Sequence, residues 1–294
     1  MRDEKRVVKE FYENYGWRST NEGLYNDTAD FVDVRPVLKE YQRNTMGRIS
    51  ATLPKRGGFF LDAGCGAVPS EQHARLCEGY SHRVCVDFSL AALGEARKKL
   101  GEKALYVQAD ITCLPFRKES FDAILCAHVL YHIPPDEQGL AIREIGSALT
   151  REGLAAIVYT WPMCLMTKLA INLNPRMVLP RIPGARYIWR KLFRPASYDS
   201  VSASCQNAGA PSLYFYPQDF LTMKKHFTGL RWEMRCWQSV SLAFSNAFIP
   251  NNSAGSALLR VIFLMERVFP HLMARIGCYP LFIVRRTSGN EREV

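Results

Sequence analysis

Two glycines follow a short apolar run near residue 60, in the stretch Leu61-Asp-Ala-Gly-Cys-Gly66. Glycine allows a tight turn, and no side chain then stands between the backbone and a bound molecule. A helix that starts after the turn directs free backbone N–H groups to the same place. Gly-x-Gly alone also suits a purely structural turn. The dinucleotide fingerprint is not met, because its third glycine would fall at Pro69.

Carboxylates stand at the ends of the next two apolar runs. Asp87 ends Val84–Asp87, where it can accept hydrogen bonds from both hydroxyls of a ribose. Asp110 follows Ala104–Gln108, where it can accept from an adenine amino group while Ile111 packs on the ring. Each aspartate alone also suits a cap or a turn. Their order at successive strand ends favours a nucleoside ligand.

The elements that must position these residues alternate along the chain. The expected strands are 59–62, 84–87, 104–108, 121–127, 154–160, 231–240 and 279–285, and the expected helices are 33–52, 70–79, 89–100, 135–150, 217–227 and 253–276. Buried strands that alternate with helices favour a parallel sheet covered on both faces. The sequence therefore predicts an α/β fold.

Five stretches resemble the successive motifs of class I S-adenosylmethionine-dependent methyltransferases. They are DAGCG (62–66), VDFS (86–89), ADITCLPF (109–116), FDAIL (121–125) and HVLYHIP (128–134). The subtype that they resemble most is the small-molecule group that includes ubiquinone/menaquinone and sterol methyltransferases. The resemblance covers about residues 57–160 and implies a Rossmann-like doubly wound sheet of about seven strands. Six of these would be parallel, and the last, 279–285, would be antiparallel.

The resemblance also implies a cofactor site for S-adenosylmethionine, with S-adenosylhomocysteine as product. The expected cofactor-binding residues are Asp62, Gly64, Cys65, Gly66, Asp87, Phe88, Asp110, Ile111 and His128. Asp62, Gly64 and Gly66 would line the methionine end, and Asp87 would bind the ribose. Asp110 and Ile111 would bind the adenine, with Phe88 beside it, and His128 would lie near the sulfonium and the acceptor. The family's usual third glycine falls at Val68, a departure that can tighten or shift the next helix.

Methyl transfer mainly requires that an acceptor be positioned in line with the methyl group. A base helps when the acceptor is a hydroxyl. The candidate catalytic residues are His128 and His132, although either also suits a packing or capping role. The candidate walls of the substrate pocket are Tyr15, Trp17, Tyr131 and Tyr214, with ordinary core packing as the alternative. No cluster has the spacing of a metal site, so no bound metal is expected.

The positive charge of the chain lies in its second half. The net charge is +10, but residues 1–152 hold 21 basic and 22 acidic residues, whereas residues 153–294 hold 17 and 6. Residues 163–195 contain seven basic residues and no acid, interleaved with apolar side chains, Trp and Tyr. This composition is typical of a segment that contacts an anionic membrane. The alternative is a cover over the substrate pocket.

A nucleic acid is a disfavoured partner. Base-modifying methyltransferases carry an Asn/Asp-Pro-Pro-Tyr/Phe motif where this chain has HVLYHIPP at 128–135. The charged start of the chain lacks the apolar run of a secretory signal, and no stretch is long and apolar enough to span a bilayer. The nine scattered cysteines suit free thiols in a reducing compartment. We therefore expect a cytoplasmic protein, with the inner face of a membrane as a further location.

Four segments make up the predicted organisation. They are an N-terminal helical cap (1–56), an S-adenosylmethionine-binding core (57–160), a basic apolar insertion or lid (161–210) and a C-terminal part of the sheet (211–294) with an inserted helix (253–276). The predicted function is methyl transfer to a small, apolar or lipid-linked acceptor, at oxygen. The alternatives are methylation of a soluble sugar or secondary metabolite, and a non-catalytic S-adenosylmethionine-binding partner subunit.

Overall fold

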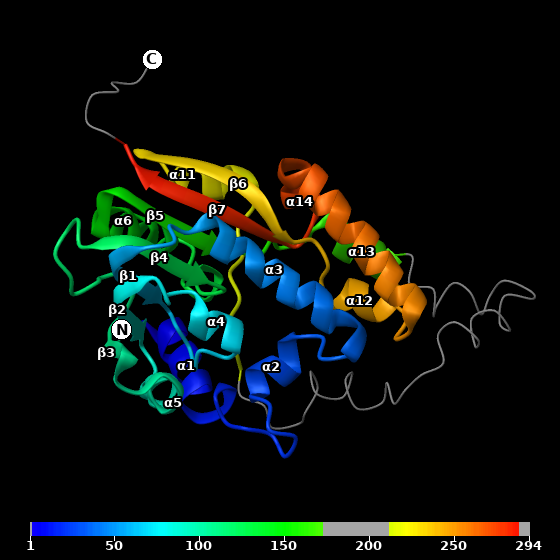
Figure 1. Ribbon diagram of the computed structural model, residues 1–294, viewed down its shortest axis with the longest axis horizontal. Helices are drawn as coiled ribbons and strands as arrows, with labels where there is room; N and C mark the ends of the chain where they lie inside the picture. The colour runs from blue at the N-terminus through cyan, green and yellow to red at the C-terminus, as the bar shows by residue number, and fades with distance from the viewer. Residues whose placement is uncertain (1, 173–211, 288–294) are drawn as a thin grey trace, which may run out of the picture.

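The computed structural model describes residues 2–172 and 212–287, which form a seven-stranded sheet in the order β3-β2-β1-β4-β5-β7-β6 (Figure 1). The strands are β1 (Gly57–Ala63), β2 (Tyr80–Asp87), β3 (Ala104–Gln108), β4 (Phe121–Ala127), β5 (Leu149–Val158), β6 (Leu230–Gln238) and β7 (Tyr279–Arg286). Within these residues β7 runs antiparallel to both of its neighbours, and the other neighbouring pairs are parallel. The predicted Rossmann-like α/β fold with an antiparallel last strand is confirmed.

Helices cover both faces of this sheet. On one face lie α3 (Lys39–Thr52), α4 (Glu71–Arg75) and α5 (Leu90–Leu100), and on the other lie α6 (Gln138–Ala148) and α11 (Phe220–His226). Figure 1 shows α3 in front of the sheet and α6 behind it. The remaining described helices are α1 (Asp3–Phe11), η1 (Tyr12–Gly16), α2 (Asn26–Phe31), η2 (Pro36–Leu38), η3 (Gly101–Lys103), η4 (Leu130–His132), α7 (Leu165–Asn172), α12 (Leu242–Phe248), α13 (Ser253–Val268) and α14 (Pro270–Ile276).

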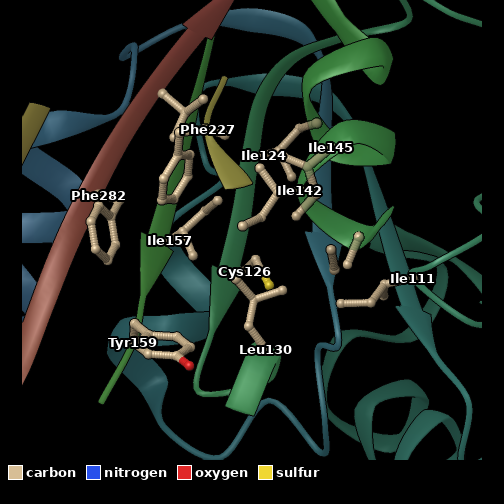
Figure 2. Packing of buried hydrophobic residues seen from close by; sticks show 14 of the residues in the cluster. Ile111, Ile124, Cys126, Leu130, Ile142, Ile145, Ile157, Tyr159, Phe227 and Phe282 are labelled. Carbon is tan, nitrogen blue, oxygen red and sulfur yellow. The ribbon is translucent and has the colours of Figure 1, made fainter. Parts of the chain in front are cut away.

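Alternating side chains of the central strands supply the core on each face. Ile124 of β4 and Ile157 of β5 point toward Ile142 and Ile145 of α6, as Figure 2 shows. Their strand neighbours, such as Leu125, point to the opposite face and pack with residues of α3. A strand buried on both faces reads as a continuous apolar run, which is why these runs were recognisable in the sequence.

The helix expected over 89–100 is α5, whereas the strand before it begins at Tyr80, four residues earlier than expected. Ser89 caps α5, because its side chain accepts a hydrogen bond from the backbone N–H of Ala92. Gly101 ends the helix with a φ of 57°, a conformation that glycine adopts without a Cβ penalty. The cap at Ser89 fixes the turn between β2 and α5, which follows Asp87.

Three expected helices differ in the structure. The helix expected over 33–52 begins at Lys39, after the short 3-10 turn η2. The helix expected over 70–79 ends at Arg75, so α4 has only five residues. The single helix expected over 253–276 is two helices, α13 and α14, with a break at Phe269. Pro270 causes the break, since it has no backbone N–H to donate and its ring clashes with the preceding turn.

The described part of the insertion is short. It comprises residues 161–172 with α7, and residues 173–210 lie outside the described residues. Among the helices that the structure describes, none combines the length and apolar character needed to cross a bilayer. The cysteines in residues 2–172 and 212–287 are all free thiols, most of them buried.

Candidate functional site

The turn after β1 forms a cradle of backbone atoms. Gly64 and Gly66 have φ values of 74° and 54°, and the N–H groups of Gly64 and Cys65 both donate to the carbonyl of Val86. A Cβ on Gly64 would lie 2.4 Å from Val129, and a Cβ on Gly66 would lie 2.5 Å from the ring of Trp17. Both positions therefore require glycine for conformation and for space.

Val68 occupies the position of the missing third glycine. Its φ is 47°, in the left-handed region that a β-branched residue rarely adopts. Lys99 of α5 holds this turn, because its Nζ donates to the carbonyl oxygens of Ala67 and Val68 at 3.1 and 2.9 Å. The turn is therefore held with a strained β-branched residue where sequence analysis noted the departure from glycine.

Asp87 lies at the end of β2 and faces the cradle. Its Oδ2 accepts from the N–H of Gly66 and its Oδ1 accepts from the N–H of Ser89, both at 2.9 Å. Burial raises the pKa of this carboxyl group to about 6, although the hydrogen bonds from Ser89 and Gly66 favour the charged form. The carboxylate lines the main cavity, where sequence analysis placed a ribose-binding group.

Asp110 and its neighbours line the same cavity, but Asp110 is already engaged. Its Oδ1 accepts from the backbone N–H of Thr112 at 2.9 Å, and its Oδ2 accepts from Nζ of Lys5 at 2.7 Å. Lys5 is buried and also pairs with Glu137. Through Lys5, helix α1 is therefore held against the part of the cavity wall that contains Asp110, near Ile111.

Asp62 was expected at the methionine end of the cofactor, but it is not among the residues that line the cavity. Its Oδ2 pairs with the guanidinium of Arg83 and lies 2.8 Å from Nε2 of His73. Burial opposes ionisation, but His73 and Arg83 together lower the pKa of Asp62 to about 2. Asp62 therefore holds β1 to β2 and α4.

Both candidate histidines lie in the cavity wall. His128 follows β4 with a φ of 64°, and its ring centroid lies 4.8 Å from that of Trp237 and 5.4 Å from that of Tyr279. Burial lowers the pKa of His128 and of His132 to about 4. Both imidazoles are therefore neutral near pH 7, as a proton acceptor must be.

His132 belongs to a hydrogen-bonded chain. Its Nδ1 lies 3.0 Å from the carbonyl oxygen of Tyr214, and its Nε2 lies 3.2 Å from the hydroxyl of Tyr12. Because a carbonyl oxygen only accepts, Nδ1 carries the hydrogen and Nε2 presents its lone pair to Tyr12. Burial also raises the pKa of the Tyr12 hydroxyl well above its ordinary value, so Tyr12 is a neutral donor.

The four predicted aromatic walls divide into two pairs. Trp17 and Tyr131 line the cavity. Tyr15 and Tyr214 are not among the lining residues. The hydroxyl of Tyr15 donates to Asp30, and the backbone carbonyl of Tyr214 accepts from Nδ1 of His132. Sequence analysis did not single out Lys5, although it lines the cavity. A contact between residues more than a hundred positions apart leaves no periodic signal in the sequence.

The cavity has a volume of about 1200 Å³, and we divide its lining residues into two groups, called the first arm and the second arm. The first arm is lined by the cradle, Asp87, Asp110 and α1. The second arm is lined by residues of α2, of α3, of the segment between them and of the segment 237–245. Ligand pockets usually measure about 300–1000 Å³, so this cavity has room for two ligands side by side. Among the described residues, no group of three or more His, Cys, Asp or Glu could hold a metal ion.

The first arm fits S-adenosylmethionine by the chemistry of its walls. The glycine cradle leaves the space that a Cβ would fill, and Asp87 offers a carboxylate beside it. Ile111 and Phe88 supply apolar surface for a purine ring, and Trp17 closes the cradle from the side of the N-terminal helices. These are the groups that a nucleoside with a charged tail requires.

Comparison with known proteins agrees with this geometry. Residues 61–157 match the family described as a methyltransferase domain. Carboxy-S-adenosyl-L-methionine synthase of Wolinella succinogenes is 31% identical over 109 residues, or 35% of this chain and 45% of that protein. Demethylmenaquinone methyltransferase of Clavibacter sepedonicus is 28% identical over 122 residues, or 40% of this chain and 49% of that protein. The chain thus spans about half the length of these two curated relatives.

A solved structure shares the fold over nearly the whole chain. Magnesium protoporphyrin IX methyltransferase from Synechocystis PCC 6803, with bound S-adenosylmethionine, has a TM-score of 0.53. It is 14% identical and covers 97% of this chain and 98% of its own. The likeness shows the fold alone. The family match and the shared fold together confirm the predicted resemblance to class I S-adenosylmethionine-dependent methyltransferases over residues 61–157. The predicted cofactor, S-adenosylmethionine, is confirmed with it.

Proposed function

We propose that the chain transfers a methyl group from S-adenosylmethionine to an oxygen atom of an apolar or lipid-linked small molecule. The observation that carries this proposal is the set of apolar walls in the second arm, which belongs to the same cavity as the cofactor cradle. These walls include Phe31, Val32, Val34, Leu38, Met46, Ile49, Val240 and Leu242. A cavity lined in this way favours an acceptor that buries apolar surface.

The names of two relatives support this acceptor class. One is a demethylmenaquinone methyltransferase, and another, from Synechocystis, is a magnesium-protoporphyrin O-methyltransferase that is 26% identical over 165 residues. Both names describe a methyltransferase that acts on a large, ring-containing substrate.

In this proposal Asp87 holds the ribose, and the cradle of Gly64 and Gly66 lies against the methionine end of the cofactor. S-adenosylmethionine, when bound, supplies an electrophilic methyl group. Tyr12 and His132 move the proton: the acceptor hydroxyl gives its proton to Tyr12 as Tyr12 gives its own to Nε2 of His132. The 3.2 Å separation between Tyr12 and His132 supports this role.

We expect His132→Ala to lower the turnover number by about 100- to 10,000-fold, the usual contribution of a positioned general base. The assay follows S-adenosylhomocysteine release with a hydroxylated quinone, a prenylated phenol and a soluble sugar, and mass spectrometry locates the new methyl group. Affinity for S-adenosylhomocysteine should stay unchanged. His82→Ala, at an exposed histidine outside the cavity, is the matched control. Turnover with the sugar alone, or methylation at carbon, contradicts the proposal.

We further propose that the protein contacts an anionic membrane, from which a lipid-linked acceptor would enter. The predicted contact, 163–195, lies outside the described residues from 173 onward. In the described part, α13 and α14 support membrane contact through a stripe of exposed apolar side chains: Leu258, Val261, Leu264, Met265, Val268, Phe269 and Leu272. The exposed charged residues of these two helices are Arg260, Arg267 and Arg275, which are all positive. The acidic residue Glu266 is buried and pairs with Arg48.

Co-sedimentation with vesicles tests the membrane contact. We expect binding to anionic vesicles that weakens as salt rises, because the attraction of basic residues to the surface is screened. Val261→Asp should reduce this binding, and Leu221→Asp, at an exposed leucine on α11, should not. Equal sedimentation with neutral and anionic vesicles, or no sedimentation with either, contradicts an anionic membrane as the partner.

A further inference from the structure

Asp27 is a carboxylate in the wall of the cavity, on helix α2 of the N-terminal segment. The hydroxyl of Tyr12 and the carboxylate of Asp30 lie next to it, and Asp30 disfavours its charge. No ion pair joins Asp27 to a lysine or arginine within residues 2–172 and 212–287. Asp27 is half-buried, and a carboxylate partly removed from water without a cation is costly, so a cationic ligand would lower that cost.

The cations of the cavity are engaged elsewhere or lie in solvent. Lys5 is held by Asp110 and Glu137 at the far end of the first arm. Lys39 and Arg43 line the cavity from α3 but are exposed. Water screens exposed charges strongly, so these two side chains do little for a half-buried carboxylate.

Aromatic rings surround the same point. The ring of Tyr12 stacks on Trp17 with centroids 5.5 Å apart, and it meets His132 edge-on at 5.7 Å. Tyr131 lies against His132 at 4.7 Å, and all four rings line the cavity. The faces of aromatic rings attract cations, above all weakly hydrated onium groups. Trp17 also touches the cradle at Gly66, which places this aromatic wall next to the methionine end of the cofactor arm.

We propose that Asp27 and the rings of Tyr12, Trp17 and Tyr131 form a subsite for an onium cation, and that its ligand is the sulfonium of S-adenosylmethionine. The inference rests on the proposed cofactor placement and not on the nature of the acceptor. Methyl transfer turns the sulfonium into a neutral thioether, so the subsite favours the charged cofactor over the product. Because this contact is strongest before transfer, Asp27 acts on cofactor exchange more than on the transfer step.

The ionisation of Asp27 supplies a second readout. Burial, with a further contribution from Asp30, raises the pKa of Asp27 to about 7. Tyr131 interacts with the same carboxylate. Near pH 7 a bound cation therefore converts protonated Asp27 to the carboxylate and releases a proton. A neutral thioether ligand releases none through this group.

Isothermal titration calorimetry of the full chain tests the subsite with S-adenosylmethionine and S-adenosylhomocysteine. We expect Asp27→Asn to weaken binding of S-adenosylmethionine by about 10- to 100-fold, the effect of losing a charge-assisted contact. Binding of S-adenosylhomocysteine should change by less than about threefold, within the usual scatter of a neutral contact, which also shows that the variant is folded. Glu22→Gln, at an exposed carboxylate of the cavity, is the control and should change neither ligand.

Titrations in two buffers of different ionisation enthalpy measure the released proton. Wild-type protein should release it with S-adenosylmethionine at pH 7, and Asp27→Asn should not. An ammonium on the acceptor is the other source of a cation, and choline added to the S-adenosylhomocysteine complex probes it. Choline binding that depends on Asp27, without any effect of Asp27→Asn on S-adenosylmethionine, overturns the sulfonium assignment. Equal weakening of both cofactor forms overturns the subsite. Since no acceptor is present, neither result bears on the proposed methyl transfer.

Discussion

Replacing Asp62 by leucine is expected to lower the free energy of unfolding by about 3–5 kcal/mol, the usual cost of breaking a buried ion pair. The side chains of Asp62 and Arg83 are 2% and 1% exposed. Without the carboxylate, the guanidinium stays buried between β2 and α4 with only backbone carbonyls and a thiol as partners. Urea denaturation followed by circular dichroism measures the change.

The same pair gives stability a defined dependence on pH. The folded pKa of Asp62, about 2, lies below its ordinary value of 3.8. The carboxylate therefore contributes its full stability above about pH 4, and the contribution is lost as pH falls toward 2. The difference in unfolding free energy between wild type and Asp62→Leu should shrink over this window.

Two further variants test whether the buried pair of Asp62 and Arg83 causes the loss of stability. Arg83→Met combined with Asp62→Leu should recover most of the loss, because an apolar pair of similar volume replaces a buried ion pair with little cost. Glu71→Gln breaks an exposed pair with Arg75 and should leave the denaturation midpoint unchanged. Loss of S-adenosylhomocysteine affinity in Asp62→Leu at unchanged stability would place Asp62 in the cofactor site and contradict the structure.

Asp62 also shows where sequence reasoning reached its limit. The motif located Asp62 correctly at the end of a buried strand, two residues before the first glycine, because the alternation of buried strands and turns is visible in the sequence. Which way its side chain points depends on Arg83, whose strand pairs with β1 in the folded sheet. The family pattern alone could not choose between a ligand and a buried cation as the partner of this carboxylate.

The strand-end residues were predictable for a physical reason. In parallel sheets the carboxyl ends of the strands meet at one edge, so Asp87 and Asp110 had to lie near the glycine turn. The N-terminal segment was not predictable in this way. Lys5, Tyr12 and Asp27 reach the cavity because α1 and α2 fold back over that edge, through contacts such as Lys5 with Asp110. Such contacts have no local sequence pattern.

Gly66→Ala is expected to weaken S-adenosylhomocysteine binding by about 10- to 100-fold, because it strains the backbone at the point where the cradle meets the ligand. Gly66 has a φ of 54°, which an alanine adopts only at a cost. Its new Cβ would also lie 2.5 Å from the ring of Trp17. Either the turn or Trp17 must move, and both line the cofactor arm.

The hydrogen bond from Gly66 to Asp87 links this change to the ribose end of the site. The N–H of Gly66 donates to Oδ2 of Asp87 at 2.9 Å, so a shifted turn also moves or frees that carboxylate. Calorimetry with S-adenosylhomocysteine measures the loss. Gly94→Ala is the matched control, since nothing lies within 4 Å of its new Cβ on α5. It should stabilise the fold by about 0.5–1 kcal/mol and leave the affinity unchanged. Full affinity in Gly66→Ala would mean that the ligand does not approach this turn.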